Sequence, residues 1–292
     1  MKGLVSRPCG SWKLTLRNGK TVTLGDATVF PRLPNGKVDK GSNAPLAISG
    51  DGSRVVYFRK SDRKLVWKNV AGGSSRAFPG KAAKVPKGLG MGDLSIKLSR
   101  EGDRVAIDYG DADGSLPSLL VDLRGGGMAQ LPGFDTVQGF SPDGTHVLTT
   151  NFTEDNTTGF TVYDTEGNPG EDRVVPQVAS NNSPIALADD QVTVGLVITP
   201  LTGVGKPRLR QYDLSTDAIS PALELNLPAG EMPYRLYWDE NGKLVVWGVR
   251  GNLSGLADRA TARRVDPSTG ELTKIDSFRM KPDVWTWWLP GE

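Results

Sequence analysis

His146 is the only histidine of this chain, and histidine is the commonest general base of enzymes. It follows the turn Ser141–Gly144 and begins an alternating apolar segment, a position typical of a packed or surface residue. The chain has no Gly-x-Ser-x-Gly sequence to position a hydrolase nucleophile, and Cys9 is its only cysteine. A Ser-His-Asp triad and a Cys- or His-rich zinc site are therefore not expected. We predict no catalytic residue, no bound metal and no cofactor.

The densest group of carboxylates is Asp108, Asp111 and Asp113, followed by Gly114. Carboxylate oxygens are the ligands that calcium prefers, but no glutamate closes the loop as in an EF-hand. We therefore interpret these residues as an acidic turn in solvent. Two further aspartates, Asp103 and Asp143, lie beside predicted strands, and paired carboxylates are the groups that hydrolyse glycosidic bonds.

Positive charge is concentrated in the first third of the chain. Residues 1–100 contain 20 Lys and Arg against 5 Asp and Glu, a net +15, whereas residues 101–292 carry −13. Eight of the cations in residues 59–87 come from two groups, one in a predicted hairpin and one in the connection after it: Arg59, Lys60, Arg63, Lys64 and Lys68, then Lys81, Lys84 and Lys87. Such asymmetry indicates an anionic partner, and these eight residues are the predicted binding site. Nucleic acid is disfavoured, because few aromatic residues interleave with these cations and no nucleic-acid motif is present.

The elements that must position these residues come from an internal repeat. Each copy has an apolar residue, a polar turn with Asp or Gly, and an alternating apolar segment, which indicates a hairpin. The five copies are Ile48–Phe58, Leu98–Ile107, Phe140–Thr149, Leu187–Val194 and Tyr237–Trp247. A third strand follows each copy and ends in Asn or Asp, at Asn69, Asp122, Asp164, Asp213 and Asp266. These positions are 53, 42, 49 and 53 residues apart, and a fourth extended piece follows, as expected for propeller blades of roughly 40–50 residues.

The chain length leaves room for a sixth blade made from both ends. Trp12–Leu16 and Thr21–Leu24 flank an Asn-Gly turn, and Val284–Leu289 alternates as a single strand. No segment shows helical periodicity. We therefore predict an all-β, six-bladed β-propeller of four-stranded antiparallel blades, its ring closed by strands from both termini. In this prediction residues 1–292 form one domain, 1–10 are a flexible tail, and 11–44 with 279–292 form the closing blade.

The five turn-and-strand copies, with the Tyr-Asp or Val-Asp ends of their third strands, resemble those of TolB-like and WD-repeat-like bacterial six-bladed β-propellers. The resemblance covers most of residues 45–289. It implies a rigid surface that is displayed to partners, and a location at the cell exterior or in the periplasm. The first ten residues contain no recognisable signal peptide, and no apolar run reaches the roughly 18 residues of a membrane span.

Together these observations predict a non-enzymatic binding or adaptor protein. Its basic sector, the part of the fold that carries the eight cations named above, docks an anionic partner. An acidic protein and a cell-surface glycopolymer both remain possible as that partner. Salt-sensitive self-association, basic sector against acidic remainder, is a further possibility. The alternative from another class is a propeller hydrolase that acts on glycans through carboxylates near a central channel.

Overall fold

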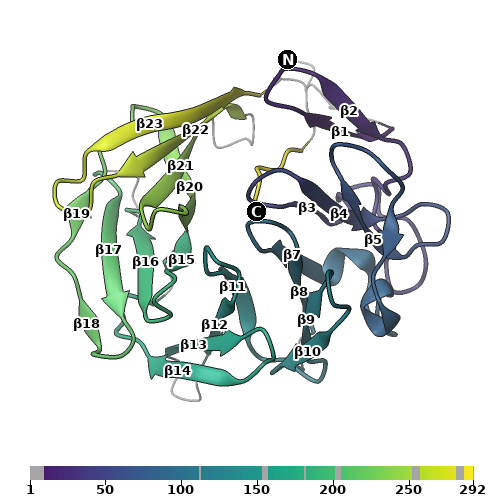
Figure 1. Ribbon diagram of the computed structural model, residues 1–292, viewed down its shortest axis with the longest axis horizontal. Helices are drawn as coiled ribbons and strands as arrows, with labels where there is room; N and C mark the ends of the chain where they lie inside the picture. Colours follow the sequence, from purple (N-terminus) through teal and green to yellow (C-terminus); the bar gives the residue numbers. More distant parts are fainter. Residues whose placement is uncertain are drawn as a thin grey trace. The chain divides into compact units, whose positions relative to one another are not determined.

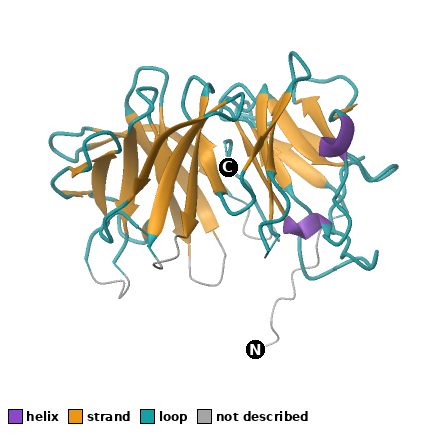
Figure 2. Cartoon of the chain, turned by 90° about the horizontal axis from the view of Figure 1, so that it is seen from below, coloured by secondary structure: helices purple, strands orange, loops and turns teal. Residues whose placement is uncertain are grey.

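The computed structural model describes residues 10–111, 113–152, 157–180, 182–200, 205–251, 257–280 and 286–291. The chain divides into two compact units, residues 1–135 with 283–292, and residues 136–282. Antiparallel strands and their turns make up both units, with two short helices in the first (Figure 2). In the residues described, no helix has the length and hydrophobicity needed to span a bilayer. The predicted tail lies almost wholly outside the described residues.

The first unit contains a two-stranded hairpin and two four-stranded sheets, each a simple antiparallel meander (Figure 1). The hairpin is β1 (Trp12–Thr15) and β2 (Thr21–Leu24). The first sheet is β3 (Leu46–Ile48), β4 (Arg54–Phe58), β5 (Leu65–Asn69) and β6 (Arg76–Ala77). Two 3₁₀ helices, η1 (Gly80–Ala83) and η2 (Met91–Asp93), lie in the connection to the next sheet. That sheet is β7 (Leu94–Leu98), β8 (Arg104–Tyr109), β9 (Ser118–Asp122) and β10 (Met128–Leu131).

The second unit contains three antiparallel sheets, two of them four-stranded and one five-stranded. The first is β11 (Thr136–Phe140), β12 (His146–Phe152), β13 (Thr158–Asp164) and β14 (Pro169–Val174). The next is β15 (Ile185–Leu187), β16 (Thr193–Ile198), β17 (Arg208–Asp213) and β18 (Ala218–Ile219), with β19 (Leu223–Glu224) also paired to β17. The last is β20 (Glu231–Trp238), β21 (Leu244–Gly251), β22 (Ala257–Val265) and β23 (Leu272–Arg279).

In three of the five sheets, one serine fixes the turn between the first two strands: Ser49, Ser99 or Ser141. In the first sheet the Ser49 hydroxyl donates to Asp51 at 2.6 Å and accepts the Arg54 N–H at 2.9 Å. Ser99 repeats both bonds in the second sheet, to Asp103 and from Arg104. Such side-chain bonds replace backbone pairing where the chain reverses. The predicted hairpins are therefore confirmed, and the repeated sequence is explained by turn chemistry.

The cores lie between neighbouring sheets of each unit. In the first unit, Val56 and Phe58 of β4 pack in one cluster with Ile96 and Ile107 of the next sheet. The opposite face of β4, with Val55 and Tyr57, packs against the hairpin residues Leu14 and Leu24. A strand whose two faces are both buried reads as a continuous apolar run, which explains the sequence Val-Val-Tyr-Phe.

The predicted sixth blade is wrong: besides the β1–β2 hairpin, the described residues form five sheets, four of them four-stranded and one with β19 as a fifth strand. Strands β1 and β2 pair only with each other over their described length, and residues 286–289 are not in a strand. The C-terminal segment is instead anchored by packing, because the Trp288 ring meets Trp12 edge-on at 5.3 Å. The Gly291 N–H also donates to the Ile48 carbonyl. Val284 and Trp285, at the start of the predicted strand, lie outside the described residues.

The turn after β7 packs closely against the first sheet at Gly102. Gly102 has φ +68°, and a Cβ there would lie 2.8 Å from the Ser49 Cβ. Gly52 has a similar φ, +75°, with open space around it. We expect Gly52→Ala to cost about 1 kcal/mol through backbone strain alone, and Gly102→Ala about 1–3 kcal/mol more. Urea denaturation followed by circular dichroism measures the difference; equal costs would contradict this packing.

Candidate functional site

A pocket of about 350 Å³ lies in the first unit, where three connecting segments meet. Its residues come from the loop before β3, the turn between β4 and β5, and the connection between η1 and η2. They are Arg32, Leu33, Gly36, Asp62, Arg63, Lys64, Lys84, Val85, Leu89 and Met91. We call this the basic pocket, because it brings together four cations and one carboxylate. Apolar side chains form the rest of its wall.

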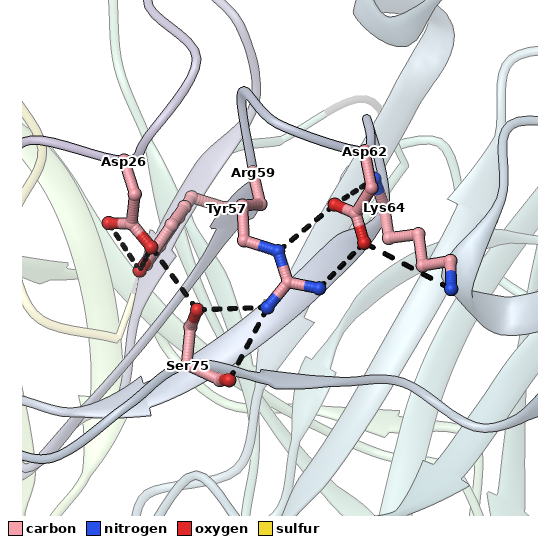
Figure 3. Close-up of polar contacts among 6 residues, drawn as sticks. All are labelled: Asp26, Tyr57, Arg59, Asp62, Lys64 and Ser75. Carbon is pink, nitrogen blue, oxygen red and sulfur yellow. Dashed lines mark hydrogen bonds and ion pairs between the residues drawn. The ribbon is translucent and has the colours of Figure 1, made fainter.

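The β4–β5 turn is held by a charged clamp (Figure 3). The Arg59 guanidinium donates to both carboxylate oxygens of Asp62, at 3.0 and 2.6 Å. These bonds lower the pKa of Asp62 to about 2, so its carboxylate stays ionised. The Lys64 ammonium lies 4.0 Å from the same carboxylate. Arg59 is thus committed to closing the turn, and its charge offsets that of Asp62.

Behind the clamp lies a second layer of hydrogen bonds (Figure 3). The Arg59 guanidinium donates to the Ser75 hydroxyl at 3.2 Å, and that hydroxyl donates to Asp26 at 3.1 Å. The Tyr57 hydroxyl, on a side chain buried in the core, donates to Asp26 at 2.9 Å. Burial, together with the Asp26 carboxylate, raises the pKa of Tyr57 to about 12. The turn is therefore tied to the hairpin and to the chain before β6.

The loop that carries Arg32 is held against the η2 segment by close backbone contact. The Met91 N–H donates to the Arg32 carbonyl at 2.8 Å. A Cβ at Gly90 would lie 2.8 Å from that same oxygen, so this approach requires glycine. The Arg32 guanidinium donates to the Gly36 carbonyl at 2.7 Å, across the turn of its own loop. The pocket is thus formed before any ligand arrives.

Two of the cations have no partner among the residues that the structure describes. Within the described ranges, no hydrogen bond or ion pair involves the Arg63 guanidinium or the Lys84 ammonium, and both residues are exposed. Arg63 also has φ +59°, a left-handed conformation that is uncommon for a side chain with a Cβ. Gln191 and Asp217 adopt the same conformation in other turns of the chain, and such conformations are enriched at functional sites.

The structure brings together three of the eight predicted binding residues, Arg63, Lys64 and Lys84. Arg59 closes the turn, and Lys60 donates to the carbonyls of Gly10 and Gly25. The remaining three lie outside the pocket lining: Lys68 on β5, Lys81 in η1, and Lys87 in the connection after it.

Sequence reasoning missed Arg32 and the apolar wall. Arg32 is 27 positions before Arg59 in a loop that was assigned to the closing blade. No local pattern marks it, because its place depends on the contact with Gly90 and Met91. The Asn35-Gly36 turn beside it was the available signal that this loop doubles back.

The carboxylates considered for chemistry have polar partners within their own sheets and turns. Asp103 accepts the Ser99 hydroxyl and pairs with Arg124, and Asp143 accepts the Ser141 and Thr145 hydroxyls. Asp108 is buried and accepts the Ser118 hydroxyl. In the described part of the chain, no group of three or more His, Cys, Asp or Glu side chains could hold a metal.

His146 and Asp111 likewise have local partners. The His146 ring Nδ1 lies 2.8 Å from the Thr145 hydroxyl, and the His146 N–H donates to Ser141 in the first turn of its sheet. The Asp111 carboxylate accepts the Ser115 hydroxyl and the Leu116 N–H. The Ser115 hydroxyl, and then the Leu116 N–H, lower the pKa of Asp111. These contacts are those of a turn.

Comparison with solved structures identifies the fold. A structure from Agrobacterium tumefaciens that carries the name TolB matches 87% of this chain and 90% of its own, with a TM-score of 0.50 and 14% identity. TolB from Acinetobacter baumannii (TM-score 0.49, 15% identity) is matched over 84% of this chain, which spans only 61% of the TolB chain. The β-propeller domain of Cps50 (Swd1) from Myceliophteria thermophila matches with a TM-score of 0.47 and 17% identity. The match covers 82% of this chain and 73% of that domain's chain.

At these identities the likeness shows the fold alone: an all-β propeller with four-stranded antiparallel blades. A shared fold does not by itself select a function, because one architecture carries many unrelated activities. No protein-family model matches the sequence. No curated protein matches it significantly either.

Because the pKa of Tyr57 is raised by folding, we expect the free energy of unfolding to fall at alkaline pH. The pKa of the Tyr57 hydroxyl is about 12 in the folded state and about 10 in the unfolded state. The contribution of this group to the free energy of unfolding is therefore fully present below pH 10 and is lost between pH 10 and 12. Tyr57→Phe removes that loss and costs about 2 kcal/mol at neutral pH, because Asp26 loses a donor. Urea midpoints across pH measure both effects.

Tyr109 is the matched control for Tyr57. Burial alone raises its pKa to about 12. Tyr109→Phe should therefore flatten the alkaline loss with little cost at neutral pH. Equal neutral-pH costs for the two variants would contradict a stabilising role of the Tyr57–Asp26 bond.

Replacement of Arg63 by glycine should not destabilise the fold. Because glycine adopts a φ near +60° without strain, Arg63→Gly should leave the free energy of unfolding unchanged or raise it by up to about 1 kcal/mol. A surface turn whose arginine stabilised the fold would instead lose stability. Thermal denaturation of the variant beside the wild type decides between the two.

Proposed function

We propose that this chain is a non-enzymatic binding protein, and that its basic pocket docks an anionic group of a partner. The observation that carries the proposal is the imbalance of charge in one pre-formed pocket. Arg32, Arg63, Lys64 and Lys84 face a single carboxylate, Asp62, and Arg59 already pairs with it. Four cations held together repel one another, and an anionic ligand removes that repulsion.

The mechanism has two stages. The net +15 of residues 1–100 attracts an anionic surface over distances up to the Debye length, about 8–10 Å at physiological salt. Contact then depends on the unpaired Arg63, whose planar fork can bind a carboxylate or phosphate with two parallel hydrogen bonds. Binding should weaken steeply as salt rises, because screening removes the first stage.

The partner is an acidic protein or an anionic cell-surface polymer. The pocket lining includes no aromatic ring on which a base could stack, which disfavours nucleic acid. The likeness to structures named TolB is compatible with a location outside the cytoplasm, and we propose that location.

Charge reversal tests the docking site. We expect the variant with Arg32, Arg63, Lys64 and Lys84 all changed to Glu to bind fluorescein-labelled poly-L-glutamate about 100-fold more weakly than the wild type, by fluorescence anisotropy at low salt. The control changes four exposed lysines outside the pocket to Glu: Lys13, Lys20, Lys81 and Lys87. Its formal charge changes equally, and its affinity should fall less than about threefold.

If both variants lose binding equally, net charge and not the pocket attracts the anion, and the proposed site is wrong. Light scattering of the wild type at low and high salt tests for self-association. A molecular mass that falls as salt rises would show that the basic residues bind a second copy of the chain. Hydrolysis of a glycan panel, abolished by one carboxylate substitution, would overturn the non-enzymatic assignment.

A further inference from the structure

The basic pocket has an apolar wall that charge alone does not explain. Leu33, Val85, Leu89 and Met91 line it together with the cations. Met91 is buried and belongs to the core cluster of the first unit, with Val85 and Leu89 packed against it. Leu33 is different, because 42% of its surface is exposed. A leucine at the mouth of a basic pocket offers apolar surface to whatever enters.

From this arrangement we infer that the ligand is an acidic peptide segment that places one apolar side chain between its carboxylates. The inference rests on the proposed function and adds the chemical class of the ligand. Its carboxylates would pair with Arg63 and Lys84, and the apolar side chain would lie against Leu33 and Val85. A volume of about 350 Å³ is at the lower end of the range for ligand pockets, and suits a side chain or two.

The single carboxylate in the lining favours a peptide over a phosphate polymer. Asp62 is fixed by Arg59, stays ionised, and has its side chain 32% exposed. A dense run of phosphates would meet this charge with repulsion. A peptide, by contrast, carries backbone N–H donors between its carboxylates, and an ionised carboxylate has about four acceptor positions. A sugar-phosphate chain would also leave the apolar wall without a matching group.

The pocket is already in the form that such a ligand needs. Its Arg32 loop is fixed by the Met91–Arg32 hydrogen bond and the close contact at Gly90, and its β4–β5 turn is fixed by the Arg59–Asp62 clamp. Pre-organised pockets bind with less loss of conformational entropy than flexible ones. A short peptide motif is therefore sufficient as a ligand, and a large complementary surface is not required.

The test compares two fluorescein-labelled peptides of equal length and equal negative charge. One has Asp and Glu residues on either side of a central Leu, and the other has Ser in place of that Leu. We expect the wild type to bind the Leu peptide about tenfold more tightly, because apolar surface is buried against Leu33. Anisotropy at fixed salt measures both affinities.

Two exposed residues of one loop provide the matched variants. Leu33→Ser should lose most of the tenfold preference and bind the Ser peptide as the wild type does. Val38 is 44% exposed, lies in the same loop across from Arg32, and is not part of the pocket lining. Val38→Ser should therefore keep the preference, which controls for damage to the loop.

The outcomes separate this inference from the proposed function. Equal affinities for the two peptides, with poly-L-glutamate still bound through the four cations, would overturn the apolar anchor and leave the anionic docking site intact. Tighter binding of inorganic polyphosphate than of the Leu peptide would also overturn it, in favour of a phosphate polymer. Loss of the preference in Val38→Ser would place the anchor elsewhere. If none of the anionic probes binds, the proposed function itself fails.

Discussion

The bidentate contact between Arg59 and Asp62 is the interaction on which the shape of the basic pocket depends. It closes the turn between β4 and β5, and Ser75 connects it to Asp26 and thereby to the hairpin β1–β2. Because the guanidinium is held by both the carboxylate and the Ser75 hydroxyl, the turn has one defined shape. That shape places Lys64 and Arg63 beside the loop of Arg32. Without it the same cations would be separate surface charges, each hydrated and weakly attractive.

The clamp also explains why positive charge along a sequence is a poor guide to a binding site. Arg59 and Lys60 are the first residues of the cationic run, yet both are bound to groups of the protein itself. The cations that can still bind an external anion are those without a partner in the protein itself. Which cations these are depends on the folded structure and not on the order of residues in the sequence. The cations of the pocket that could meet an external anion are Arg63 and Lys84, which have no internal partner in the described part of the chain.

The blades could be predicted because their determinants are local. Short polar side chains fix each turn through their own hydrogen bonds, as Ser49 with Asp51, Asp190 and Asp239 do, and alternation then sets the strands. The number of blades could not be predicted in this way. Whether residues 284–289 pair as a strand depends on distant segments, and in residues 286–289 packing of Trp288 on Trp12 replaces a strand. Alternating apolar residues are compatible with either outcome.

The pocket combines features that each reduce stability when considered alone. Arg63 has a backbone conformation that glycine would adopt more easily, and Leu33 exposes apolar surface that the core could have buried. Unpaired cations close together add repulsion. A stable fold needs none of these features, and natural proteins retain such costs mainly where function requires them. That three of them, with different physical origins, meet in one pre-formed pocket is the strongest reason to regard it as a site that binds a ligand.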